Sequence, residues 1–246
     1  MCCRLPLLPR GALRAKGGDG WLRPGAPYYN FFVKPIFLAL LLLLGGCSDR
    51  EWTLPDQPGA LLLTHGHGLA DPNYAIIRNA LTGAGYKVSA VDVPCHAPGE
   101  AQLQCWRQMY NRGESFDAFV AGTVARMDNI QVVVGISRAG YIALLIAAVN
   151  REPVKYVLLA PVVDLFDLAE FDGAVPMLNH DARNLPLTGK QIFLAIGRAD
   201  TRVSTATSID LAARFRDVHL VLTDTPDHSQ PRVEPEILHW LAAHPI

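Results

Sequence analysis

From about residue 60 onward, short apolar runs alternate with longer segments of helical periodicity. Most runs are rich in Val, Leu and Ile without polar alternation, which is typical of strands buried on both faces of a parallel sheet. Six strands are predicted, at residues 60–64, 87–92, 130–134, 154–160, 191–196 and 219–222. Six helices are predicted, at residues 72–85, 103–110, 116–127, 141–149, 204–216 and 234–243. This alternation predicts an α/β fold with a mostly parallel sheet and helices on both of its faces.

The amino end has a different pattern. Residues 36–44 are almost purely apolar, too few to span a bilayer comfortably but suited to the hydrophobic region of a signal peptide. The run ends in Leu44-Gly45-Gly46-Cys47, which resembles the bacterial lipobox. The resemblance implies a lipoprotein whose Cys47 carries acyl chains such as palmitate. A buried helix or an uncleaved anchor is the alternative, and more than thirty residues before the run depart from the usual signal.

These patterns divide the chain into a leader and lipoprotein signal segment at 1–46, a polar tether at 47–59 and an α/β domain at 60–246. A length of 246 residues suits one such domain with a targeting segment. The lipobox resemblance implies a location in the bacterial cell envelope. Because Ser48 rather than aspartate follows the cysteine, we expect the outer membrane, with the domain facing the periplasm.

The charge and the cysteines narrow the classes of partner. Lys and Arg number 22 against 23 Asp and Glu, so no overall field would recruit nucleic acid, and none is expected. Membrane contact is expected only through the lipid anchor. Two of the five cysteines, Cys95 and Cys105, fall in the predicted domain. Export to an oxidising compartment permits a disulfide between them, and two free thiols are the alternative.

The strongest chemical signal is Gly135-Ile136-Ser137-Arg138-Ala139-Gly140, between a predicted strand and a predicted helix. A serine flanked by small residues in that context is typical of a nucleophile elbow, the tight turn that raises a reactive hydroxyl above the sheet. A capping serine on an ordinary strand-to-helix turn is the alternative interpretation.

Other reactive residues follow other predicted strands. Asp200 comes after the strand at 191–196, and His228 after the last strand. The carboxyl ends of parallel strands meet at one edge of a sheet, so these side chains should gather near Ser137. A serine needs a base, and the base needs an acid that orients it, so we predict His228 and Asp200 in those roles. Asp164 is the alternative acid.

The oxyanion formed during acyl transfer needs fixed donors. We predict the backbone N–H groups of Arg138 and His67, the latter in the His65-Gly66-His67-Gly68 loop after the first strand. His65 is interpreted as a structural residue that bonds the loop backbone. The Arg138 side chain could attract an anionic substrate or simply face solvent.

These residues together resemble those of the α/β-hydrolases. The resemblance rests on His65-Gly66, the Ser137 elbow, Gly197-x-x-Asp200-x-x-Val203 and His228, and spans roughly residues 60–245. The Asp200 pattern is similar to that of the prolyl-oligopeptidase-like and dienelactone-hydrolase-like branches. Because the opening antiparallel strands have no room before residue 60, we expect a reduced α/β-hydrolase fold of about six strands.

The resemblance implies a serine hydrolase that cleaves a carboxylic ester through an acyl-enzyme, without a metal or an organic cofactor. Its substrate would be a small-molecule or lipid-like acyl compound. The alternatives are an acyltransferase, a thioesterase or an amidase with the same triad, or a non-catalytic lipoprotein that serves as a binding module. A lid over an acyl pocket, or plain packing, is predicted for Phe166, Leu168, Phe171, Met177 and Leu178.

Overall fold

The computed structural model describes residues 57–95, 102–112, 116–173, 180–226, 228 and 231–246. The leader, the proposed signal segment, Cys47 and most of the tether lie outside these residues, as do Met177 and Leu178. Among the described helices, none is both long and apolar enough to cross a membrane.

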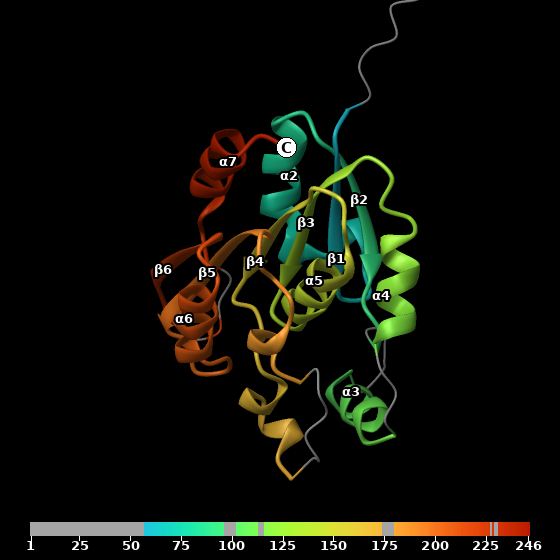
Figure 1. Cartoon of the computed structure of the whole chain (residues 1–246), viewed down its shortest axis with the longest axis vertical. Helices are drawn as coiled ribbons and strands as arrows, with labels where there is room; N and C mark the ends of the chain where they lie inside the picture. Colours follow the sequence, from blue (N-terminus) through green and yellow to red (C-terminus); the bar gives the residue numbers. More distant parts are fainter. Residues whose placement is uncertain (1–56, 96–101, 113–115, 174–179, 227, 229–230) are drawn as a thin grey trace, which may run out of the picture. The chain divides into compact units, whose positions relative to one another are not determined.

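The core of the molecule is one six-stranded sheet in the order β2-β1-β3-β4-β5-β6 (Figure 1). The strands are β1 Gly59–Thr64, β2 Lys87–Asp92, β3 Ile130–Ile136, β4 Lys155–Leu159, β5 Gln191–Ala199 and β6 Val218–Pro226. Every pair of neighbours is parallel. The predicted parallel sheet of about six strands is therefore confirmed, and all carboxyl ends lie along one edge.

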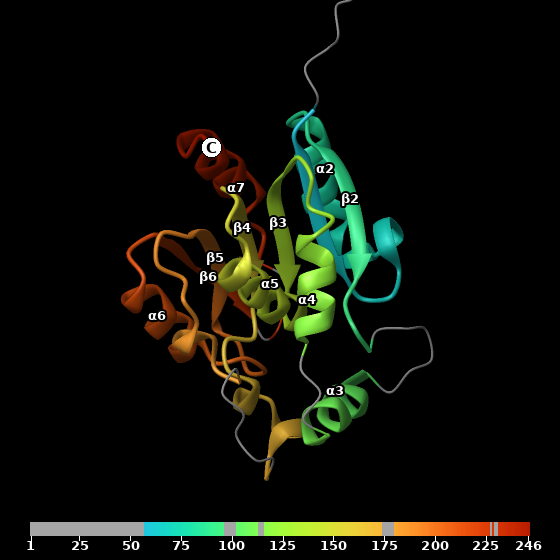
Figure 2. The ribbon, with the colours of Figure 1, turned by 45° about the vertical axis from the view of Figure 1, so that its right-hand side comes forward.

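Helices cover both faces of the sheet (Figures 1 and 2). They are α2 Ala75–Gly83, α3 Gln102–Asn111, α4 Asp117–Val124, α5 Arg138–Val149, α6 Thr205–Arg214 and α7 Glu234–Ala243. Apolar side chains of α2 and α7 share one buried cluster with alternate strand residues, and those of α4, α5 and α6 share the cluster on the opposite face. The prediction of helices on both faces is also confirmed.

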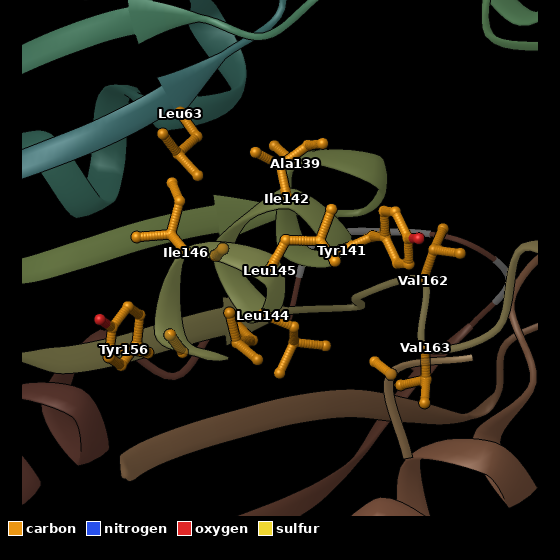
Figure 3. Close-up of a cluster of buried hydrophobic side chains, with 14 of the residues drawn as sticks. Leu63, Ala139, Tyr141, Ile142, Leu144, Leu145, Ile146, Tyr156, Val162 and Val163 are labelled. Atoms are coloured by element: carbon orange, nitrogen blue, oxygen red, sulfur yellow. The ribbon is translucent and has the colours of Figure 1, made fainter. Parts of the chain in front are cut away.

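The helix that follows the elbow, α5, is the most enclosed. Its residues 139–147 are all buried, because it packs across β3 and β4 at the centre of the sheet. Figure 3 shows Leu144, Leu145 and Ile146, which belong to α5, among the buried side chains of the core. Burying one such side chain stabilises a fold by about 1.5–3 kcal/mol. The helix that carries the elbow at its start is thus anchored through residues 139–147.

Two segments beyond the carboxyl edge form a cap over part of it (Figures 1 and 2). A disulfide joins Cys95, after β2, to Cys105 in α3, so the disulfide alternative is the one that the structure contains. Tyr110 of α3 packs edge-on against Phe166 and Phe171 of the segment after β4, with ring centroids 6.1 and 5.3 Å apart. Phe171 is fully buried, which favours packing over an open lid for this part of the segment.

Candidate active site

Ser137 stands at the turn between β3 and α5 in a strained backbone conformation. Its φ is 54° and its ψ is −121°, in a region that residues with a Cβ rarely adopt and that costs on the order of 1–3 kcal/mol. Hydrogen bonds fix the turn from both sides: the Ser137 N–H donates to Leu159 O at 2.9 Å, and Ser137 O accepts from Val162 N at 3.0 Å. The neighbouring strand end of β4 therefore holds the serine in this conformation.

Two glycines make the turn possible. A Cβ on Gly135 would lie 2.5 Å from the backbone oxygen of Ala139, and one on Gly140 would lie 2.6 Å from Pro161 Cβ. Neither contact is sterically allowed. The sequence predicted small residues at Gly135 and Ala139; the second position that admits no side chain is in fact Gly140, where α5 crosses Pro161.

The structure brings Ser137, His228 and Asp200 together from three separate loops. Ser137 Oγ lies 2.9 Å from His228 Nε2. The other ring nitrogen, His228 Nδ1, lies 2.9 Å from Asp200 Oδ2 and 3.2 Å from Oδ1. The Asp200 side chain has no exposed surface, and that of His228 is 22% exposed. The three groups thus form a continuous hydrogen-bonded chain from a buried carboxylate to a half-buried hydroxyl.

Asp200 is held in place by its own loop. Its Oδ1 accepts the backbone N–H groups of Arg202 and Val203, each at 2.9 Å. These two bonds fix the carboxylate with one oxygen turned toward His228. They also give a physical reason for the spacing of the acid loop, since the residues two and three positions later close a turn around the carboxylate.

Asp164 lies elsewhere and does not meet His228. Its Oδ1 is 3.0 Å from His180 Nδ1, and its Oδ2 is 3.2 Å from the Arg183 guanidinium. These bonds close the base of the segment that forms the cap after β4. Asp164 therefore bonds residues at the root of that segment, and in this structure Asp200, not Asp164, contacts His228.

The loop after β1 wraps around a different carboxylate, that of Asp92. Asp92 Oδ1 accepts the Thr64 hydroxyl at 2.7 Å and the N–H groups of Gly66 and Gly68 at 2.8 and 3.1 Å. Burial raises the pKa of Asp92, but these bonds, together with one from the His67 backbone, outweigh it and hold the pKa below its ordinary value. The His67 N–H is turned toward Asp92 here, so its oxyanion role stays a prediction.

Arg138 is the first residue of α5, and the first amides of a helix point out of its N-terminal end. Its side chain does not simply face solvent. The guanidinium lies 5.5 Å from the centre of the Trp106 ring of α3. Burial, and after it the nearby guanidinium of Arg202, lower the pKa of Arg138 from 12.5 to about 10. The side chain is a partly buried cation between the elbow and the cap.

The side chain of His65 is half-buried beside the elbow, with 17% of its surface exposed. Burial lowers its pKa from 6.5 to about 4. The neighbouring Asp71 and the backbone of Ile136, the residue before Ser137, raise the pKa and only partly offset this. The structural role predicted for His65, bonding the loop backbone, stays a prediction.

Sequence reasoning missed three features of the site: the packing of Gly140 on Pro161, the Asp92 carboxylate inside the loop after β1, and the buried Tyr74 hydroxyl beside β3. Asp92 does carry a signal, because it ends a predicted strand as the other site residues do. Tyr74 carries none, because a tyrosine at helical spacing is indistinguishable from a core residue. In the part of the chain that the structure describes, no three His, Cys, Asp or Glu side chains are grouped to hold a metal ion.

Comparison with known families gives one match. Residues 89–222, more than half of the chain, match the family described as "Putative esterase". The matched region runs from β2 through the elbow and the Asp200 loop to β6, and ends before His228. No curated protein matches the chain in sequence.

Three solved structures illustrate the similarity of fold. An esterase from Pyrococcus furiosus has a TM-score of 0.57 and 18% identity, over 76% of this chain and 83% of that one. A monoacylglycerol lipase from Paleococcus ferrophilus has 0.55 and 15%, over 77% and 96%. Est1E from Butyrivibrio proteoclasticus, solved with ferulic acid bound, has 0.52 and 16%, over 79% and 94%. At these identities the likeness establishes the α/β-hydrolase fold.

Proposed function

The chain belongs to the "Putative esterase" family, and from that premise we propose that it is a serine carboxylesterase with Ser137 as nucleophile, His228 as base and Asp200 as the orienting acid. The observation that carries the proposal is the pair of hydrogen bonds on the two sides of one imidazole. Nε2 is 2.9 Å from Ser137 Oγ, and Nδ1 is 2.9 Å from Asp200. That is the geometry a general base needs.

In the proposed reaction, Ser137 Oγ bonds to the ester carbonyl carbon while its proton moves to His228 Nε2. The tetrahedral oxyanion accepts the Arg138 N–H, and a second N–H from His67 once that amide turns from Asp92. The carbon–oxygen bond to the alcohol then breaks, and His228 returns the proton to the leaving oxygen. Water attacks the acyl-enzyme with His228 again as base, releasing the carboxylic acid and free Ser137.

A fluorophosphonate probe tests the proposal against a non-catalytic binding module. Such a probe reacts with an activated serine hydroxyl, so the wild-type chain should be labelled and the Ser137→Ala variant should not. Ser204 supplies a matched control, because its hydroxyl caps α6 through the Thr207 N–H and is not activated by a histidine. Labelling that is unchanged in Ser137→Ala, or absent from the wild type, would reject the serine esterase.

We propose further that the substrate is a small-molecule or lipid-like ester. A series of chromogenic esters of increasing acyl length gives the chain-length preference, because the leaving group is constant. Matched thioesters and anilides in the same assay separate the thioesterase and amidase alternatives. Adding a small alcohol separates the acyltransferase, since transfer would raise the yield of the new ester at the expense of the free acid.

Within the α/β-hydrolases, we place the chain near the prolyl-oligopeptidase-like and dienelactone-hydrolase-like branches. The support is the acid loop, in which Gly197 and Val203 flank Asp200 at the predicted spacing. A Cβ on Gly197 would lie 2.5 Å from Thr225 O, and the Val203 N–H donates to Asp200. Gly197 therefore has a steric reason to be glycine, and the residue at position 203 helps to hold the carboxylate of Asp200 through its backbone.

We further propose that Cys47 is a lipidation site and that the enzyme is held on the bacterial outer membrane, facing the periplasm. The support is the apolar run that ends in Leu44-Gly45-Gly46-Cys47. Each buried methylene contributes about 0.8 kcal/mol, so stable anchoring needs more than one acyl chain. Mass spectrometry of the mature amino terminus should find a multiply acylated Cys47. An unmodified Cys47 still joined to Gly46, in protein from its native envelope, would refute the anchor alone.

A further inference from the structure

Beside the elbow, the pairing of β1 with β3 ends one residue before β3 itself ends. Strands β1 and β3 pair in register up to Leu63 and Gly135, the last matched pair. Ile136 follows in β3 and pairs with Leu159 of β4 on its other side, but it has no partner residue in β1. At this point β1 gives way to the loop that carries His65 and His67. The two segments that hold the proposed nucleophile and its predicted oxyanion donor therefore separate here.

The hydroxyl of Tyr74 lies between the two strands at this point. It accepts the Ile136 N–H at 3.0 Å and donates to the carbonyl oxygen of Leu63. Tyr74 is fully buried and lies just before α2, where its own N–H donates to Asp71 O at 3.1 Å. One hydroxyl thus takes the place of a backbone hydrogen bond between the two strands, at Ile136, the last residue of β3, and at Leu63, the residue before the last in β1.

His65 packs beside the Tyr74 ring, with ring centroids 6.0 Å apart. The Asp71 carboxylate, itself fully buried, fixes the start of the same loop by accepting the His65 N–H at 3.0 Å. The Tyr74 hydroxyl therefore bonds the Ile136 N–H on its β1 side, while Asp71 ties the loop after β1 to the segment that carries Tyr74.

We propose that Tyr74 is a positioning residue that sets the spacing between the nucleophile elbow and the loop after β1. This inference rests on the proposed serine esterase. Ile136 precedes Ser137 directly, and Leu63 precedes His67 by four residues, so the hydroxyl couples the two backbones whose separation decides where an oxyanion meets its donors. A displacement of about 1 Å in such a geometry can lower a rate about 100-fold.

The test is the Tyr74→Phe variant, which removes one oxygen atom and keeps the ring. The matched control is Tyr156→Phe. Tyr156 is also fully buried with a hydrogen-bonded hydroxyl, 3.1 Å from Asn150 Nδ2, but it lies near the start of β4, at the edge of the sheet away from Ser137. Both variants lose a buried hydrogen bond, so both should lower Tm. Only the first should act on catalysis.

In Tyr74→Phe we expect kcat on a chromogenic ester, and the rate of fluorophosphonate labelling, to fall about 10- to 100-fold with KM within about twofold. In Tyr156→Phe both rates should equal those of the wild type. Equal rates in the wild type and Tyr74→Phe would overturn the inference. So would an equal loss in the two variants, because that would trace the effect to stability alone.

Amide hydrogen exchange reads the same contact without turnover. The Ile136 N–H should exchange at least about tenfold faster in Tyr74→Phe than in the wild type, and unchanged in Tyr156→Phe. Unchanged exchange at Ile136 in Tyr74→Phe would overturn the inference even if the esterase proposal holds. A wild-type chain that is not labelled at Ser137 would instead reject the esterase proposal, and the positioning role with it.

Discussion

Two histidine–aspartate pairs in this molecule have nearly the same geometry and do different things. His228 Nδ1 lies 2.9 Å from Asp200, with the two side chains 22% and 0% exposed. His180 Nδ1 lies 3.0 Å from Asp164, with 23% and 12% exposed. The pairs differ in what the second ring nitrogen and the second carboxylate oxygen meet. The comparison teaches that an oriented imidazole becomes a candidate base only when a hydroxyl lies on its far side.

At the sheet edge, the far nitrogen of His228 meets Ser137 Oγ. At the root of the cap segment, the His180 ring packs edge-on against Phe166 with centroids 4.8 Å apart, and Asp164 shares its other oxygen with Arg183. The Asp200–His228 pair orients an imidazole toward a hydroxyl, as the proposed base requires. The Asp164–His180 pair, with Arg183, links two chain segments.

The largest expected effect is the loss of turnover in Ser137→Ala and His228→Ala. Each should lower kcat by about 10⁴-fold or more, because triad members act as a unit. The double variant should be little worse than either single variant, which steady-state assays on a chromogenic ester will measure. If Ser137→Ala hydrolysed the ester at a rate like that of the wild type, the proposed catalytic role of the His228–Asp200 pair would be wrong.

Asp200→Asn should lower kcat by about 10⁴-fold, somewhat less than the loss of serine or histidine. The amide keeps the shape of the side chain but no longer stabilises the imidazolium. Circular dichroism should show an intact fold. If this variant hydrolyses esters as fast as the wild type, the acid has been misassigned.

A third histidine–aspartate pair, His65 and Asp71, differs from the other two because its histidine makes the stability of the fold depend on pH. The pKa of His65 is lowered from 6.5 to about 4 by burial, so the unfolded chain binds this proton more readily. Its contribution to stability is fully present above about pH 6.5 and is lost as the pH falls toward 4, a loss of up to about 3 kcal/mol.

Urea unfolding at pH 7.5 and pH 4.5 should therefore show a larger drop in stability for the wild type than for His65→Gln, which cannot titrate. The difference between the two drops isolates His65 from the carboxylates that also titrate in this range. Equal drops in both proteins would mean that His65 is not held neutral by burial.

The smallest effect is expected at the cap root. Asp164→Asn weakens the bonds to His180 and Arg183, so it should lower the free energy of unfolding by about 1–2 kcal/mol. Turnover of a short ester should stay within about twofold of the wild type, because Asp164 does not contact His228. A loss of turnover as large as that of Asp200→Asn would show that the two pairs are not functionally distinct.

The same comparison shows which parts of the candidate site could be predicted from the sequence. Ser137, Asp200 and His228 each follow an apolar run, and a parallel sheet brings the ends of such runs together, so their proximity follows from topology. The choice between Asp200 and Asp164 does not, because both follow strands. It depends on His180 and Arg183, whose positions come from a segment without periodicity.

The contacts that support the site could not be predicted from the sequence, because they too depend on how distant segments pack. Tyr74 reaches Ile136 across 62 positions, and Gly140 is required only because α5 crosses Pro161. Neither residue type nor spacing encodes such contacts, since both depend on how helices settle on the sheet. The strand ends were placed to within a few residues: β3 and β5 extend the predicted runs by two and three residues, and β6 ends four residues beyond its predicted end at 222.

The central claim is that Ser137 forms a covalent acyl intermediate. The direct measurement is to mix the enzyme with a 4-nitrophenyl ester, quench with acid within the first turnover and map the acyl group by tandem mass spectrometry. We expect one acyl group on the peptide that contains Ser137, and none in Ser137→Ala. An acyl group on another residue, or a burst of product with Ser137 unmodified, would contradict the claim.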